Sequence, residues 1–189
     1  MLVWIVGFIG CGWQIVWAQP KYEQEYRIRP SEVPEAAASF LQEIGWSSKI
    51  KWYREEGLNQ TSIEAKVKEA GSRYSVEFDS TGQLQDVEML ITEEEIPEET
   101  LNKIEGFLQK EHDKHRYRRI QRQFTGKTAA ILQQLQVGEA TSEVVIRYEV
   151  VVKTRTGKRH EWIEYLFSET GELLRTSPIV LRRTDHLEF

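Results

Sequence analysis

Two short stretches of this chain share a pattern that predicts the same local structure twice. They are Tyr74–Leu84 and Ile163–Leu173, and both contain Phe-x-x-Thr-Gly-x-Leu when they are aligned at a shift of 89 residues. Before each Thr-Gly pair, apolar and polar residues alternate with a period of two, which is typical of a half-buried strand. The residues that lead to Gly82 and Gly171 suit a type I turn followed by a glycine at positive φ. Each stretch is therefore expected to form a β-hairpin.

The same order of elements precedes each hairpin. Residues 33–45 and 96–108 each begin with an apolar residue, a proline and a glutamate, and each carries an apolar stripe at helical spacing. Alternating segments follow both helices. The sequence thus predicts an α+β fold of two tandem repeats, each a short helix packed on a small antiparallel β-sheet. The second copy has an insertion, residues 125–141, which we expect to be an extra strand or an amphipathic loop that covers core, with a docking loop as the alternative.

The first 18 residues carry no charge and are mostly apolar, and small residues stand at Val16 and Ala18. This pattern predicts a secretory signal peptide cut after Ala18, and hence a periplasmic or secreted protein. The single cysteine, Cys11, follows Ile9-Gly10 and gives lipid attachment as the alternative. Once the signal peptide is removed, the chain cannot form a disulfide.

Further segments complete the predicted organisation. The segments are a signal peptide at 1–18, a flexible leader at 19–30, the two repeats at 31–92 and 93–181, and a C-terminal tail at 182–189. A net charge of -5 argues against general nucleic-acid binding, which relies on phosphate neutralisation. We expect no integral membrane span in the mature chain.

No arrangement of residues predicts a catalytic site or a cofactor. The sequence shows no glycine-rich phosphate loop after a strand and no Ser-His-Asp or Cys-His set, so an enzyme is not expected. His112 and His115 lie three apart, which is a metal-ligand spacing on a helix. Their segment is densely charged, ends a predicted helix and offers no cysteine, so we interpret them as solvated residues. The basic run Lys114–Arg122 is interpreted as solvated charge.

The strand faces opposite the predicted helices mix charged and aromatic side chains. Large aromatic residues among charges are typical of interface anchors. We therefore predict a protein-binding surface with ten candidate residues: Lys51, Tyr53, Lys66, Arg73, Glu77, Arg147, Glu149, Trp162, Glu164 and Leu166. The expected function is an exported, non-catalytic binding module that captures an envelope protein or peptide. The alternative is a periplasmic sensor or carrier for a small ligand or metal ion, with acidic residues as ligands.

Residues 31–180 resemble the exported tandem PepSY-like, β-lactamase-inhibitor-protein-like family of Bacteroidetes-type bacteria. The resemblance is carried by helices that open with Val33-Pro34 and Ile96-Pro97, and by a strand and turn of the form Tyr-x-Val-x-Phe-Asp-x-x-Gly-x-Leu at 74–84. It implies a helix lying across a small antiparallel sheet, twice, with no catalytic residues and an exported binding or inhibitory role. The two units of the β-lactamase inhibitor itself carry disulfides, which this chain cannot form. The resemblance therefore does not extend to its target.

Overall fold

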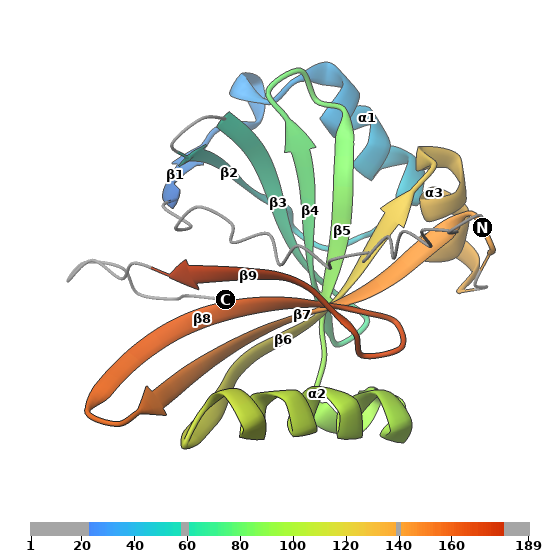
Figure 1. The fold of residues 1–189 in the computed structure, drawn as a ribbon. Coiled ribbons are helices and arrows are strands. Elements are labelled where there is room, and N and C mark those ends of the chain that lie inside the picture. Colours follow the sequence, from blue (N-terminus) through green and yellow to red (C-terminus); the bar gives the residue numbers. More distant parts are fainter. Residues whose placement is uncertain (1–22, 58–60, 139–140, 180–189) are drawn as a thin grey trace, which may run out of the picture.

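A computed structural model describes residues 23–57, 61–138 and 141–179 of the chain. In these residues, nine strands form one antiparallel sheet in which each strand pairs with the next along the chain (Figure 1). The strands are β1 (Glu23–Ile28), β2 (Lys51–Gly57), β3 (Thr61–Glu69), β4 (Ser72–Asp79), β5 (Leu84–Leu90), β6 (Lys114–Gly126), β7 (Val144–Thr156), β8 (Arg159–Ser168) and β9 (Leu173–Ile179). The last strand contains Pro178.

Three helices lie in connections between the described strands. They are α1 (Glu35–Ile44), α2 (Glu98–Glu111) and α3 (Thr128–Val137), with 3-10 turns η1 (Pro30–Glu32) and η2 (Glu93–Glu95) before the first two. The two turns are built alike: the backbone N–H of Arg29 donates to Glu32 at 2.9 Å, and that of Thr92 donates to Glu95 at 2.8 Å. None of the described helices is long and apolar enough to cross a membrane.

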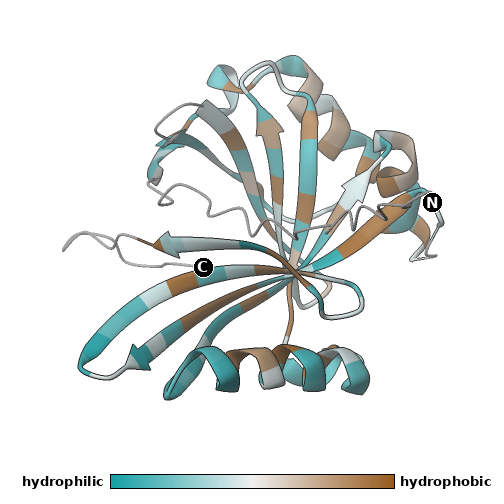
Figure 2. Ribbon diagram, in the orientation of Figure 1, coloured by the Kyte–Doolittle hydropathy of each residue, from teal (hydrophilic) through white to brown (hydrophobic). Residues whose placement is uncertain are grey.

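All three helices pack on one face of the sheet, which we call the outer face. There the apolar residues form two cores, one around Phe78 under α1 and α3, and one around Phe167 under α2. Met89 and Ile146 pack against both cores. Brown and teal segments alternate along the strands in Figure 2, because successive side chains point to opposite faces. The two cores are therefore neighbours on a single surface.

The predicted pair of separate helix-on-small-sheet repeats is wrong, because β5 pairs with β6 and continues the sheet. Val87 lies opposite Phe124, and Leu90 lies opposite Gln121. The physical reason is the length of β6 and β7, which have 13 residues each and span about 43 Å. A strand of that length reaches beyond one helix-covered core, so β6 places Ile120 in the second core and Phe124 in the first.

The two predicted hairpins are confirmed, and they are built alike. In β4–β5 the N–H of Gly82 donates to Asp79 at 3.0 Å, and in β8–β9 the N–H of Gly171 donates to Ser168 at 3.0 Å. Both glycines have positive φ, +89° and +83°. Each turn also packs closely against the start of a helix. A Cβ at Gly82 would lie 2.7 Å from Pro34 Cβ, and a Cβ at Gly171 would lie 2.9 Å from Thr100 O. The tip of each hairpin is thus fixed against the start of a helix.

Two other segments differ from the prediction. Residues 23–28 of the predicted flexible leader form strand β1, in which Tyr26 and Ile28 share one face. The insertion at 125–141 begins with the last two residues of β6 and then forms helix α3, where an extra strand or a loop was expected. Its Ile131 is 1% exposed in the first core, so the segment covers core as predicted, although the core belongs to the other half of the chain. The predicted signal peptide, Cys11 and the predicted C-terminal tail lie outside the described residues.

Candidate binding face

The face of the sheet away from the helices, which we call the inner face, carries all ten predicted binding residues. The strand register places them there, because Tyr53 lies opposite Glu64 and Glu149 lies opposite Leu166. In Figure 1 the helices lie on the outside of a strongly bent sheet, so the inner face lines the inside of the bend. The residues that were predicted on two separate sheets therefore share one continuous surface.

The ten residues differ in exposure. Lys51 and Arg73 are exposed, and Tyr53, Lys66, Glu77, Arg147 and Trp162 are partly buried. Glu149, Glu164 and Leu166 are buried, with 3%, 1% and 8% exposure. These three side chains lie beneath the accessible surface of the inner face. Helix α3 does not cover them, because it packs on the outer face. Their role in binding stays a prediction.

The middle of the inner face was missed by the sequence reasoning. Asp86 and Glu88 of β5 and Gln121 and Gln123 of β6 lie between the two predicted groups and connect them. A signal was present, since both pairs alternate with apolar or outer-face residues at a period of two. It was not used, because β5 and β6 were assigned to different sheets.

Acidic side chains form a band across the inner face from β1 to β8. This carboxylate band consists of Glu25, Glu55, Glu64, Glu77, Asp86, Glu88, Glu149 and Glu164. Two groups of three within it, Glu25–Glu55–Glu64 and Glu77–Asp86–Glu88, place one oxygen of each residue within 4.8 Å of the others. Basic side chains lie on the same face, among them Arg27, Lys66, Arg119, Arg147 and Arg175. Acidic and basic side chains are therefore interleaved across the inner face.

In the first half of the band, Lys66 joins carboxylates from two strands. Its Nζ lies 2.8 Å from Glu25 and 3.2 Å from Glu64, and Ser75 Oγ donates to Glu64 at 2.5 Å. Burial lowers the pKa of Lys66, but Glu64 and Glu25 raise it by more, so its pKa lies above the ordinary value. Lys66 is consequently charged at neutral pH.

In the second half of the band, two arginines bind buried carboxylates. Arg119 Nη2 lies 3.0 Å from Glu149 and 3.9 Å from Glu164, and Arg175 Nη2 lies 3.4 Å from Glu164. Burying ion pairs costs desolvation free energy that apolar residues of similar volume would not require. The chain therefore keeps this network at a cost in stability, which points to a role for the face other than holding the fold together.

Glu88 lies at the centre of the band and is 5% exposed. Gln121 Nε2 donates to it at 2.6 Å, and Gln123 Nε2 approaches its other oxygen at 3.5 Å. Burial raises the pKa of Glu88 well above its ordinary value, the nearby carboxylates Glu149, Glu77 and Asp86 raise it further, and Arg119 lowers it. Gln121 Oε1 is buried without a hydrogen-bond partner in the described part of the chain.

We expect Glu88→Gln to raise the free energy of unfolding at pH 7 by about 1–2 kcal/mol. The folded protein holds the Glu88 proton above pH 4.5, where the unfolded chain releases it, so wild-type stability falls as pH rises through this window. The variant has no such loss. After a rotation of the Gln121 amide, the new amide N–H also donates to the unpaired Gln121 Oε1. Urea melts at pH 4 and pH 7 measure the effect, which should be small at pH 4.

The control is Glu98→Gln on the exposed surface of α2, which should change stability by less than about 0.5 kcal/mol at both pH values. If Glu88→Gln is less stable than wild type at pH 7, Glu88 is ionised and its two amide donors stabilise the charge.

Aromatic side chains lie toward both ends of the inner face. Lys66 Nζ lies 4.9 Å from the centre of the Tyr53 ring, and Arg118 Cζ lies 5.1 Å from the centre of the Trp162 ring. Both contacts are within the range of a cation–π interaction. Five strands separate Tyr53 on β2 from Trp162 on β8, so the two rings mark a wide surface.

The two histidines with metal-ligand spacing have different partners. His112 shares a 2.7 Å hydrogen bond with the Tyr165 hydroxyl, while His115 lies 3.0 Å from Glu105. Burial lowers the pKa of His112, so this residue is neutral at pH 7. Both histidines are partly buried and have side-chain partners, so their interpretation as solvated residues is not confirmed.

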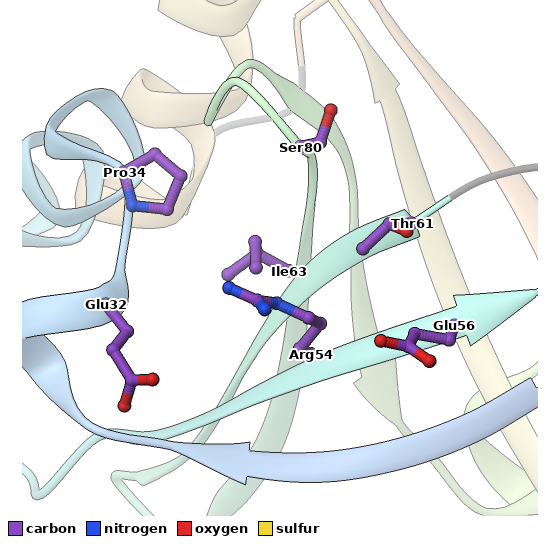
Figure 3. A pocket seen from close by; sticks show the side chains of 7 residues that line it. All are labelled: Glu32, Pro34, Arg54, Glu56, Thr61, Ile63 and Ser80. Atoms are coloured by element: carbon purple, nitrogen blue, oxygen red, sulfur yellow. The ribbon is translucent and has the colours of Figure 1, made fainter.

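A pocket of about 300 Å³ lies between the start of α1 and the ends of β2 and β3 (Figure 3). Its lining residues are Glu32, Pro34, Arg54, Glu56, Thr61, Ile63 and Ser80. Figure 3 shows Arg54 between the two glutamates, so the lining contains charges of both signs. Arg54 and Ile63 face away from the inner face, and the pocket is separate from the carboxylate band.

The architecture is that of a single antiparallel meander with helices on one face. No protein-family model and no curated protein matches the chain. Two solved structures are similar in fold. A DUF2874 family protein from Bacteroides ovatus aligns with a TM-score of 0.51 at 13% identity, over 77% of this chain and 87% of that one. A BLIP-like protein from Bacteroides fragilis aligns with a TM-score of 0.50 at 17% identity, over 82% of this chain and 92% of that one.

Proposed function

We propose that this chain is a non-catalytic protein-binding module of the bacterial cell envelope, which captures its partner on the inner face of the sheet. The observation that carries this proposal is the gathering of charged residues and two aromatic anchors, Tyr53 and Trp162, on one continuous face. Aromatic side chains next to arginine or lysine are typical of the residues that dominate binding energy at interfaces. The fold similarity to a protein described as BLIP-like supports the same class of function.

The buried charges of the inner face give a second argument. A sheet face with only a structural role is stabilised by apolar residues or by exposed polar ones. Here Glu149 and Glu164 are buried at 3% and 1% exposure beside Arg119, and burying such ion pairs is costly. Charges fixed in this way keep a defined arrangement, and complementary fixed charges give an interface its specificity and its association rate.

The test is a pull-down from envelope extract that compares wild type with the double variant Tyr53→Ala/Trp162→Ala. A recovered partner is then purified and its affinity is measured by surface plasmon resonance. The loss of an aromatic anchor at an interface costs about 2 kcal/mol, which corresponds to an affinity reduced about 30-fold. We expect each single alanine variant to show a loss of this order.

Tyr26→Ala is the matched control, since Tyr26 is a 42% exposed tyrosine on the outer-face side of β1. It should retain wild-type affinity. Circular dichroism establishes that all variants are folded. If the folded double variant recovers the partner as well as wild type does, the inner face is not the binding surface.

A further inference from the structure

We infer that the partner presents a short acidic segment, with aspartate or glutamate side chains, to a basic patch at one end of the inner face. This basic patch consists of Lys114, Arg116, Arg118, Lys153 and Arg155, from strands β6 and β7. The inference rests on the proposed function, because it specifies the chemistry of the protein that the face binds and the place where that protein makes contact.

The pairing of β6 with β7 brings the patch together from two distant parts of the chain. Lys114 lies opposite Arg155, and Arg116 lies opposite Lys153. On the other side of Lys153 lies Trp162 of β8, which belongs to the inner face. Four of the five basic side chains are exposed, and Lys153 is partly buried. Their charges are therefore accessible on one small area.

The chain itself does not neutralise this area. Within the part of the chain that the structure describes, none of the five side chains forms an ion pair with an acidic one. Glu149 and Glu164, which follow on β7 and β8 toward the middle of the sheet, lie 3.0 Å and 3.9 Å from Arg119. The two carboxylates closest to the patch on the inner face are thus paired with another cation.

Other acidic residues that are near the patch in sequence face elsewhere. Asp113 accepts a hydrogen bond from the backbone N–H of Gly157 at 2.8 Å, at the tip of the β7–β8 hairpin. Glu161 lies opposite Thr154, so strand alternation places it on the outer face. The basic run Lys114–Arg122, which the sequence indicated as solvated charge, is therefore divided between the two faces, and its inner-face part meets β7.

The patch has a cost in stability that its position does not require. Like charges directly opposite each other on neighbouring strands destabilise a sheet. The patch contains two such pairs at successive inner-face positions, Lys114 with Arg155 and Arg116 with Lys153. An acidic side chain at one position of each pair would remove this repulsion. The arrangement therefore favours an occupant that supplies negative charge from outside the chain.

Arg118 and Trp162 give the patch a defined donor. Arg118 Cζ lies 5.1 Å from the centre of the Trp162 ring, within the range of a cation–π interaction. A guanidinium stacked on a ring keeps its N–H donors at the edge of its plane, in the arrangement that fits a carboxylate. Trp162→Ala would release Arg118 as well as remove a ring. The loss of binding expected for that variant thus has a second physical cause here.

The size of the patch favours a short segment over an extended anionic surface. Lys114 and Arg118 are four residues apart on β6, which corresponds to about 13 Å, and β6 and β8 are about 10 Å apart. A few residues of peptide cover such an area. The chain as a whole has a net charge of -5, so an anionic bilayer or a nucleic acid that extends beyond the patch is repelled by the rest of the molecule.

The distribution of apolar residues also argues against a membrane. Helices and loops that bind a bilayer surface insert apolar side chains beside their basic ones. The exposed large apolar residues of the described chain are Tyr26, Val137, Val145 and Leu174. None of them is part of the patch, and Val145 is at the opposite end of β7.

The probe is a phage library of disulfide-closed random nonapeptides, selected on the immobilised full chain. Clones are sorted by their binding to Arg116→Gln/Lys153→Gln, which removes one pair of the patch. We expect the clones that lose binding to contain aspartate and glutamate at about three times their frequency in the unselected library, because complementary charge selects partners. The matched control is Lys103→Gln/Lys110→Gln, which removes two exposed charges from α2 and should retain these clones.

Synthetic peptides from the selected clones are then measured by fluorescence anisotropy. Arg116→Gln/Lys153→Gln should weaken binding about tenfold or more at low salt, and the difference from wild type should shrink at high salt. Amide replacements of the acidic residues in the peptide should weaken binding to wild type more than binding to the patch variant. Urea melts establish that the patch variant is folded, and it should be at least as stable as wild type, because a repulsive pair is removed.

The possible failures have different meanings. If the clones that depend on the patch are not enriched in acidic residues, or if no clone depends on it, the inference is wrong. Clones that depend on Tyr53 alone would leave the proposed function standing, whereas a lack of dependence on both Tyr53 and the patch counts against that function as well. If phosphatidylglycerol vesicles or a single-stranded oligonucleotide bind wild type but not the patch variant, and acidic peptides bind neither, the occupant is not a protein.

Discussion

Phe78→Ala is expected to lower the free energy of unfolding by about 3–5 kcal/mol. Phe78 is fully buried, and its ring packs edge-on against Phe40 at 5.9 Å and beside Trp52 at 6.1 Å. The substitution removes most of the side chain at the centre of the first core and leaves a cavity between α1 and the sheet. Phe167→Ala should cost a similar amount, because Phe167 occupies the equivalent place beneath Phe107.

These two variants also test whether the sheet unfolds as one unit. Because β5 pairs with β6 and the cores share Met89 and Ile146, Phe78→Ala should lower the protection of amides in both halves. Hydrogen exchange read by mass spectrometry measures this, alongside urea melts. Phe78→Leu, which keeps much of the apolar volume, is the milder comparison and should cost less. Exchange that accelerates only in residues 31–92 would mean that the halves unfold separately.

Gly82→Ala and Gly171→Ala are each expected to destabilise the protein by about 3 kcal/mol. Part of this cost is the positive φ of the turn, which is worth about 1–2 kcal/mol for a residue with a Cβ. The rest is steric, since the new Cβ would lie 2.7 Å from Pro34 Cβ in one hairpin and 2.9 Å from Thr100 O in the other. Thermal and urea melts measure the cost.

Gly45→Ala separates the two contributions. Gly45 ends α1 with a φ of +79°, and a Cβ there would have nothing within 4 Å. It should therefore cost about 1 kcal/mol, the conformational part alone. Equal losses at Gly45, Gly82 and Gly171 would show that the hairpin tips can move away from the helices, and that the close contact has no energetic consequence.

Local patterns predicted the elements well, because period and turn chemistry act over a few residues. The Thr-Gly hairpins and the helices that follow Val33-Pro34 and Ile96-Pro97 are present, and α3 could also have been predicted. Its Ala129–Gln136 segment is rich in strong helix formers, and Gly138 ends the helix with a φ of +78°.

The union of the two halves could not be predicted in the same way. The pairing of Val87 with Phe124 joins residues that are separated by helix α2, and nothing local sets that register. The same non-local pairing brings Glu88 beside Gln121 and Gln123. The centre of the candidate site therefore could not be predicted from local patterns either. The face of each predicted residue was nevertheless fixed by strand alternation, since Tyr53 and Trp162 both lie opposite the helices.

The order of the strands has a consequence for self-association. In the described part of the chain, only β1 and β9 have a single neighbour, and an exposed strand edge is a template for aggregation. Pro178 removes one backbone donor from β9, and Glu25 and Arg27 place charges along β1. Both edges thus discourage the addition of another chain, so the protein should stay free of fibrils at high concentration while its polar face stays available.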